Sequence, residues 1–117
     1  MPKPIDTFHE YVVGDILAHV DGITSKRMFG GYGLYHDGAI FAIITSDSGL
    51  YFKVDDTNRA YYESIGSEQF IYTGHTSKKP TPMPYWIIPE AIMENREQIE
   101  KLVYDSAAIT TRKTKKK

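Results

Sequence analysis

The sequence predicts an α+β fold in which one antiparallel sheet carries the N- and C-terminal helices on one of its faces. Aromatic and β-branched residues dominate positions 27–54, and glycines interrupt them, which is typical of antiparallel strands joined by tight turns. Apolar residues near both ends of the chain recur close to the 3.6-residue period of a helix. The 117 residues contain no internal repeat and match the usual size of one domain.

The first half of the chain predicts a helix followed by a meander of strands. The helix is expected from about Thr7 to His19, because Thr7 and the glutamate three residues later have the spacing of a capping box. Asp37-Gly38 is the typical pair of a two-residue type I′ turn. The strand over residues 39–44 is apolar on both faces, so we expect it in mid-sheet with something packed on each side. The expected strands of the whole chain are Ile23–Met28, Tyr32–Tyr35, Ala39–Ile44, Leu50–Val54, Gln69–Thr73 and Met83–Ile88.

The second half predicts two helices around the last two strands. A short helix should run from about Thr57 to Ser64 or Ile65, and a proline in the last strand suits a sheet edge or a strand start. A long helix should begin at Pro89 and end near Ala108. We therefore expect a single domain over residues 1–109, followed by a basic flexible tail over residues 110–117.

The composition bounds the location and the chemistry of the protein. Cysteine is absent, which excludes a disulfide framework and a thiolate metal site. No apolar run reaches the roughly 18 residues of a membrane span, and the first residues lack the apolar region of a signal peptide. We expect a soluble, cytoplasmic protein that does not contact membranes.

The charge is divided unevenly along the chain. Five of the 14 basic residues lie in the last six positions, so the remainder carries nine basic against 15 acidic residues, a net charge of about -6. An acidic body argues against a broad nucleic-acid-binding face. The basic tail either contacts phosphates as an arm or is a solvated end that aids solubility.

The residues do not predict an enzyme. Gly31 and Gly33 lack the third glycine of a dinucleotide-binding loop, and the Gly-Lys-Ser/Thr of a P-loop is missing, so a bulged, tightly packed strand explains them better. The four histidines do not have the spacing of a zinc site, and no serine has a nucleophile-elbow context. We expect no catalytic residues, no metal and no cofactor.

Aromatic residues are the best candidates for binding. Tyr85 and Trp86 lie in a proline-flanked segment and have the side chains that carry much of the energy at interfaces, although a core tryptophan under the last helix is an alternative interpretation. Tyrosines of the predicted sheet either form an exposed stacking surface or cover a sheet face under a helix. The predicted interaction residues are Arg27, Phe29, Tyr32, Tyr35, Tyr85 and Trp86.

Two blocks of the sequence resemble the N-terminal domain of TfoX-type regulators of natural competence. The first runs from Arg27 to Tyr35 (RMFGGYGLY) and continues to Asp55, and the second is Met83–Glu90 (MPYWIIPE). The resemblance covers roughly residues 8–108 and implies a secretion-chaperone-like fold. Full-length regulators of this type carry a second, helical domain, so this chain is expected to be a stand-alone N-terminal-type domain.

The resemblance implies a regulatory role and gives no catalytic residues. We therefore expect a non-enzymatic module that binds a protein partner or associates with itself, for example as a homodimer. The alternative is an accessory module that binds nucleic acid through the basic tail and exposed tyrosines.

Overall fold

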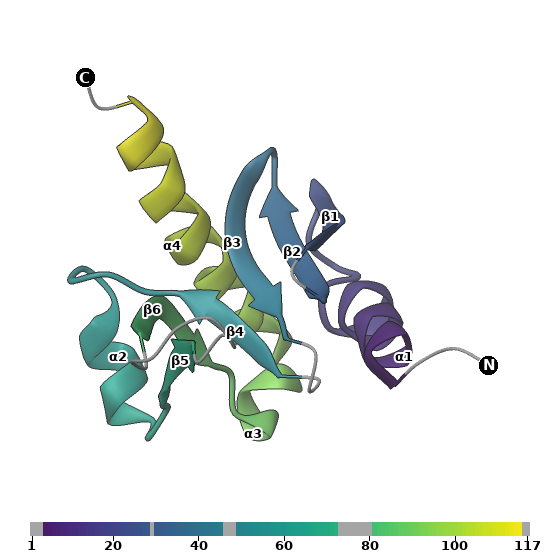
Figure 1. Cartoon of the computed structure of the whole chain (residues 1–117), viewed down its shortest axis with the longest axis horizontal. Coiled ribbons are helices and arrows are strands. Elements are labelled where there is room, and N and C mark those ends of the chain that lie inside the picture. Colours follow the sequence, from purple (N-terminus) through teal and green to yellow (C-terminus); the bar gives the residue numbers. More distant parts are fainter. Residues whose placement is uncertain (1–3, 29, 46–48, 73–80, 116–117) are drawn as a thin grey trace.

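A six-stranded antiparallel sheet forms the centre of the molecule, with strand order β1-β2-β3-β4-β6-β5 (Figure 1). The structure is a computed structural model that describes residues 4–28, 30–45, 49–72 and 81–115. Its elements are α1 (Pro4–Tyr11), the π-helix η1 (Val12–Ile16), β1 (Ile23–Met28), β2 (Gly31–His36), β3 (Ala39–Ile44), β4 (Leu50–Lys53), α2 (Arg59–Ser64), β5 (Gln69–Tyr72), β6 (Thr81–Ile87), α3 (Glu90–Met93) and α4 (Arg96–Lys115). The predicted α+β class is confirmed, as is the packing of the terminal helices against one face of the sheet.

The turn between β2 and β3 has the predicted geometry. Asp37 and Gly38 both have positive φ, at 49° and 86°, which a two-residue type I′ turn requires. The register begins with His36 opposite Ala39 and shifts at a bulge after Leu34. The sequence prediction for this hairpin is therefore confirmed down to its turn type.

The N-terminal helix differs from the prediction at both ends. It starts at Pro4, which suits a first helical turn because proline lacks only an N–H that would be unpaired there. It does not reach His19, because the chain widens into η1 and Leu17 donates to the carbonyl oxygen of Val12 at 2.9 Å, an i to i+5 bond. The wide turn places Val12, Ile16 and Leu17 together in the core.

The C-terminal helix was predicted with the wrong bounds. The chain forms two helices, because Asn95 interrupts it and its side-chain oxygen accepts from the backbone N–H of Gln98 at 3.1 Å, which caps α4. The helix also continues through Ala108 to Lys115, so the expected flexible tail from residue 110 is helical as far as the structure describes it. Contacts of Thr110 and Arg112 with the sheet side of the molecule, given below, account for the extension.

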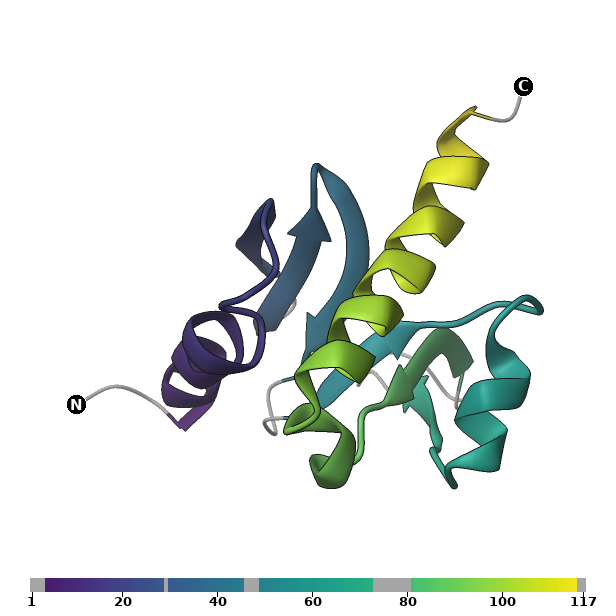
Figure 2. The ribbon, with the colours of Figure 1, turned by 180° about the vertical axis from the view of Figure 1, so that it is seen from behind.

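The core lies between the sheet and the terminal helices. Figure 2 shows α1 and α4 in front of the sheet, and the central side chains from the strands are fully buried. The largest fully buried side chains are Tyr62, Phe41, Phe52, Leu17, Leu34, Ile44, Leu50, Ile88, Ile99, Ile109, Val12 and Val103. Phe41 and Phe52 meet edge to face with ring centroids 5.3 Å apart, a favourable aromatic geometry.

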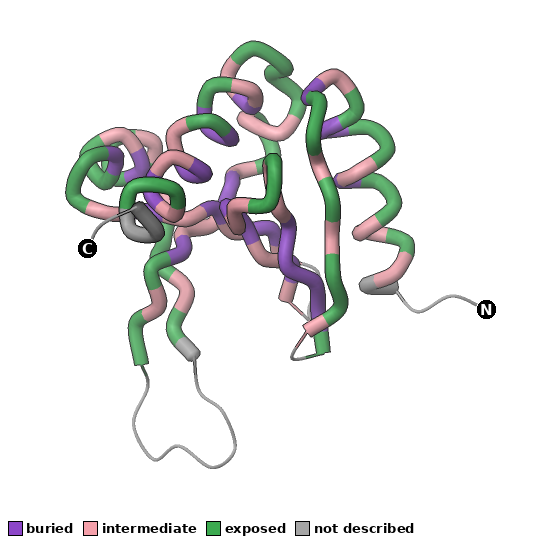
Figure 3. Tube along the Cα trace, turned by 90° about the horizontal axis from the view of Figure 1, so that it is seen from above, coloured by how far each residue is buried: buried purple, intermediate pink, exposed green. Residues whose placement is uncertain are grey.

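The β5–β6 hairpin extends away from the body of the molecule (Figure 3). Strand β4 pairs with β6 only from Tyr85 to Ile87, whereas β5 pairs with β6 as far as Thr81. The part of β6 around Pro82 therefore pairs with β5 alone, whereas the carbonyl oxygen of Pro84 still accepts from the backbone N–H of Val54 at 3.0 Å. Pro84 thus lies close to the point where β6 leaves β4, and a proline was predicted to suit a sheet edge or a strand start.

Candidate interaction surface

One face of the sheet carries α4 and the other, the open face, does not. In the part of the chain that the structure describes, no helix crosses β2, β3 or β4 on the open face (Figure 1). This corrects the prediction that both faces of β3 would be covered. The apolar and aromatic residues of the open face are Met28, Tyr35, Ile40, Ile43, Tyr51, Phe70, Tyr85 and Ile87, and the strand register places Lys26 and Lys53 on the same face.

The strand register separates the two faces residue by residue. On the open face Ile43 lies opposite Tyr51, and Tyr51 opposite Ile87, and all three side chains are half-buried. On the helix-covered face Ala42 lies opposite Phe52, and both are completely buried. The open face is thus apolar in composition but only partly removed from water.

Side chains on the open face pack on one another sideways. A Cβ built on Gly33 would lie 2.6 Å from Cε of Met28 and 3.4 Å from Cδ1 of Ile40, so these two side chains cover the glycine. The rings of Tyr51 and Phe70 have centroids 5.0 Å apart. These lateral contacts explain how an uncovered apolar strand face reaches half burial without a second layer.

A cation and two tyrosines of the open face interact with one another. Nζ of Lys26 lies 5.6 Å from the ring centroid of Tyr35, a cation–π contact. Tyr85 is the most buried member of the face, and burial together with the neighbouring Tyr35 raises the pKa of its hydroxyl. Tyr85 is therefore neutral at physiological pH. A second lysine, Lys53, lies opposite Tyr85, but its Nζ donates to the Thr110 hydroxyl of α4 at 2.9 Å.

The structure separates the six residues that the sequence analysis singled out. Tyr35 and Tyr85 lie on the open face. Arg27, opposite Tyr32 at the β1 edge, belongs to the other face, and so does Trp86, which is opposite Phe52 and packs against the core. The alternative interpretation of Trp86 as a core residue is the one the structure supports. Phe29 lies outside the described residues.

Arg27 and Tyr32 belong to a polar cluster that ties α1 to β1 and β2. The Tyr32 hydroxyl donates to Oδ1 of Asp6 at 2.5 Å, and the Arg27 guanidinium donates to both groups, at 2.7 and 3.0 Å. His9 stacks on Tyr32 with a centroid distance of 3.8 Å and a 5° interplanar angle, and its Nε2 lies 2.9 Å from the Ser25 hydroxyl.

The pKa shifts in this cluster favour a structural role. The hydrogen bond to Asp6 raises the pKa of Tyr32 and that of Arg27. Burial lowers the pKa of His9, against the opposing effect of Asp6 and Glu10. Because its pKa is raised, Tyr32 keeps its hydroxyl proton at neutral pH and donates it to Asp6, so the cluster is suited to holding the helix in place.

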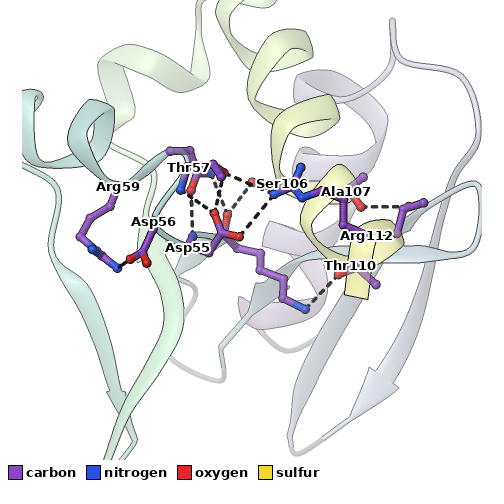
Figure 4. A network of polar contacts seen from close by, with 11 residues as sticks. Asp55, Asp56, Thr57, Arg59, Ser106, Ala107, Thr110 and Arg112 are labelled. Carbon is purple, nitrogen blue, oxygen red and sulfur yellow. Dashed lines mark hydrogen bonds and ion pairs between the residues drawn. The ribbon is translucent and has the colours of Figure 1, made fainter. Parts of the chain in front are cut away.

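A second network attaches the end of α4 to the sheet, as Figure 4 shows. Ser106 donates to the carbonyl oxygen of Lys53, and Thr110 donates to that of Ile40, both at 2.7 Å. The Arg112 guanidinium lies 3.3 Å from Oδ2 of Asp55. Arg112, predicted as part of a free basic tail, is therefore engaged in an ion pair with the body of the domain.

Asp55 sits at the centre of this network. Partial burial alone would raise the pKa of the Asp55 carboxyl, but hydrogen bonds from Thr57 and the charge of Arg112 outweigh it and lower that pKa. The backbone N–H and hydroxyl of Thr57 donate to Oδ1 at 2.8 and 2.5 Å. Asp55 is thus ionised at neutral pH and holds the β4–α2 connection against α4.

The sequence reasoning missed the aliphatic part of the open face. Ile40, Ile43 and Ile87 look like core residues because nothing in their local sequence says which strand face is covered. One signal for the open face was available in the sequence. Apolar and polar residues alternate around Tyr51, and this alternation predicted that Tyr51 lies on the more solvent-exposed face of its strand. None of the helices in the described ranges is both long and apolar enough to span a membrane.

Comparison with known proteins identifies the family. A family model described as the TfoX N-terminal domain matches residues 15–109, most of the chain, so the chain belongs to this family. Helix α1 precedes the matched region, whereas the open face lies inside it. No curated protein sequence matches the chain.

Proposed function

We propose that this member of the TfoX N-terminal domain family is a non-enzymatic regulatory module, related to regulators of natural competence, that works by binding another protein. Its binding surface is the open face of the sheet. The observation that carries the proposal is the contrast in register between buried Phe52 and half-buried Tyr51 on the two faces of the same strand.

Composition makes the open face suited to a protein partner. Tyrosine and aliphatic side chains on adjacent strands form one contiguous patch, and such patches on soluble proteins commonly mark interaction sites. Tyr35 and Tyr51 are aromatic residues of the kind that anchor interfaces. Because the open face carries the positive charge of Lys26, the partner segment that fits best is apolar with an acidic residue.

The two polar networks support a contact role for the domain. In each network the carboxylate is already paired with an arginine and a hydroxyl, Asp6 with Arg27 and Tyr32, and Asp55 with Arg112 and Thr57. Groups engaged in this way hold helices on the sheet. Because these charged groups already have partners within the domain, we assign partner binding to the open face.

Site-specific photo-crosslinking in cells tests the proposal. A photoreactive amino acid replaces Ile43 on the open face, and a matched variant carries it at the exposed Glu97 on α4. We expect discrete protein adducts from position 43 that are absent from position 97. Equal adducts from both positions, or none from position 43, would contradict the proposal.

Nucleic-acid binding is the second candidate, favoured by one observation. Lys26 over the Tyr35 ring places a positive charge beside an aromatic face, which is the pairing that single-stranded nucleic acid uses. Titration with single-stranded and duplex oligonucleotides at two salt concentrations tests it. Binding that weakens steeply with salt and is lost in Lys26→Ala supports it, and no binding at low salt removes it.

A further inference from the structure

The two edge strands of the sheet are protected very differently. Strand β1 carries Lys26 and Arg27, both exposed, and charged residues on an edge strand discourage pairing with another chain. Helix α1 is also attached to β1, through Asp6 to Arg27 and through His9 to Ser25. The β1 edge therefore carries exposed positive charges and is held by hydrogen bonds to α1, and both features oppose pairing with another strand.

In the described residues, strand β5 has neither charged residues nor a helix bonded to it in the way that α1 is bonded to β1. Its four residues, Gln69–Tyr72, include no charged residue, and Ile71 is 42% exposed. The sheet ends at β5, which pairs with β6 on its other side. An uncharged edge strand with an exposed β-branched side chain is a template for further strand pairing.

The hairpin that contains β5 is also short of pairing partners. The carbonyl oxygen of Pro84 still accepts from the backbone N–H of Val54 at 3.0 Å, and beyond it the segment around Pro82 pairs with β5 alone, as a two-stranded ribbon. The side-chain amide of Gln69 donates to the carbonyl oxygen of Met83 at 2.8 Å, which adds one side-chain bond to this ribbon. Two-stranded ribbons are marginally stable in water, and a third strand would support this one.

We propose that the occupant of the β5 edge is β5 of a second copy of this chain, paired antiparallel about a two-fold axis. The two six-stranded sheets then become one continuous sheet. The inference does not depend on the proposed partner protein, because it uses the edge of the sheet and not its open face.

Symmetry restricts how two β5 strands can pair. A two-fold axis perpendicular to the sheet keeps each face on its own side, so a residue of β5 must lie opposite itself. The axis passes through Phe70, with Gln69 opposite Ile71, or through Ile71. Both registers place apolar side chains opposite each other, and Glu68 does not face Glu68 in either.

The same operation on β1 is unfavourable. An axis through Lys26 or Arg27 places that residue opposite its own copy, and an axis through Ser25 places the two Lys26 residues two positions apart on the same face, so like charges come together across the new strand pair. The comparison favours β5 as the self-pairing edge. A β5 dimer would also place Phe70 of each copy, which contacts Tyr51, near the centre of the joined open faces.

Sedimentation equilibrium of the full chain tests the pairing. We expect a concentration-dependent mass that rises from 13.3 kDa towards twice that value. Ile71→Lys should raise the dissociation constant at least tenfold, whereas the matched edge variant Thr24→Lys on β1 should leave it unchanged. A wild-type monomer at every concentration, or a dimer that Ile71→Lys does not weaken, would overturn the proposal.

A disulfide crosslink determines the register of the pairing. It also tests the pairing independently of the Ile71→Lys variant, which could lose the dimer by misfolding. The chain has no cysteine, so Ile71→Cys introduces a single thiol. Residues directly opposite in antiparallel strands have Cα atoms about 4.5–5.5 Å apart, within disulfide range. Oxidation should link Ile71→Cys chains to one another, or to Gln69→Cys chains in the other register, but not Thr24→Cys chains. If neither β5 combination links, the pairing is wrong, whatever the adducts from position 43 show.

Discussion

The helix-covered face and the open face of this sheet are built from the same strands but differ in how they are completed. Phe52 and Tyr51 are adjacent in β4, yet Phe52 is completely buried beneath α4 and Tyr51 is half-buried among its strand neighbours. The covered face holds the domain together, and polar networks at each end fix the helices on it. The same strands therefore carry side chains that stabilise the core on one face and, under the function proposed above, side chains that make contacts on the other.

The largest expected effect is a difference in the free energy of unfolding between substitutions on the covered face and on the open face. Phe52→Ala should lower the free energy of unfolding by about 3–5 kcal/mol, because it leaves a cavity in the core. Tyr51→Ala should cost about 1 kcal/mol, because a half-buried ring loses less burial. Urea denaturation of both variants, followed by circular dichroism, measures the difference. Equal losses would mean that the open face is as much a part of the core as the covered face.

The second effect compares two glycines of β2. A Cβ at Gly31 would lie 2.0 Å from the carbonyl oxygen of Ile44, a backbone atom of the next strand, so Gly31→Ala should cost about 1–3 kcal/mol or more. A Cβ at Gly33 meets the flexible end of Met28 on the open face, which can move. We expect Gly33→Ala to cost less than about 1 kcal/mol. The same denaturation assay decides the order, and a Gly33→Ala variant as unstable as Gly31→Ala would show that Met28 is held rigidly.

Much of the fold was predictable from the sequence because strand signals are local. The Asp37-Gly38 turn fixes the β2–β3 hairpin, and Leu50, Phe52 and Val54 alternate as one face of a strand must. The course of α4 beyond Ala108 was missed because it depends on distant partners. Thr110 bonds to β3, and no local pattern reports that contact.

The candidate site was harder to predict for the same reason. Trp86 and Tyr85 are neighbours in sequence and look equally suited to binding, but adjacent strand residues point to opposite faces. Which face is covered depends on where α4 lies, and α4 comes later in the chain. The predicted interaction residues therefore divide between the two faces, with Tyr35 and Tyr85 on the open face and Arg27, Tyr32 and Trp86 on the covered side.

The ion pair at the end of α4 gives a smaller expected effect. Arg112→Ala should cost about 0.5 kcal/mol at pH 7, since both groups are partly exposed. The folded-state pKa of Asp55 is lowered, so this stabilisation is present above its unfolded pKa and is lost as the pH falls through the folded value. Thermal unfolding at pH 7 and pH 3 should show the gap between wild type and variant closing in acid.

Lys101→Ala is the matched control for the ion pair. Lys101 pairs with Asp105 inside α4 at 3.1 Å, so its removal does not affect the attachment of α4 to the sheet. A Lys101→Ala variant that loses as much stability as Arg112→Ala would show that helix formation alone, and not the contact with Asp55, accounts for the effect.

The smallest expected effect concerns the other end of the covered face, where His9 stacks on Tyr32. Burial lowers the folded-state pKa of His9, so its contribution is complete above the unfolded pKa of about 6.5 and falls as the pH drops below it. His9→Phe keeps a stacking ring that cannot be protonated beside Arg27. Between pH 7.5 and 5.5 the melting temperature of wild type should therefore fall slightly more than that of His9→Phe. Identical slopes would mean that α1 is held by Asp6, Arg27 and Tyr32 without a contribution from the neutral imidazole.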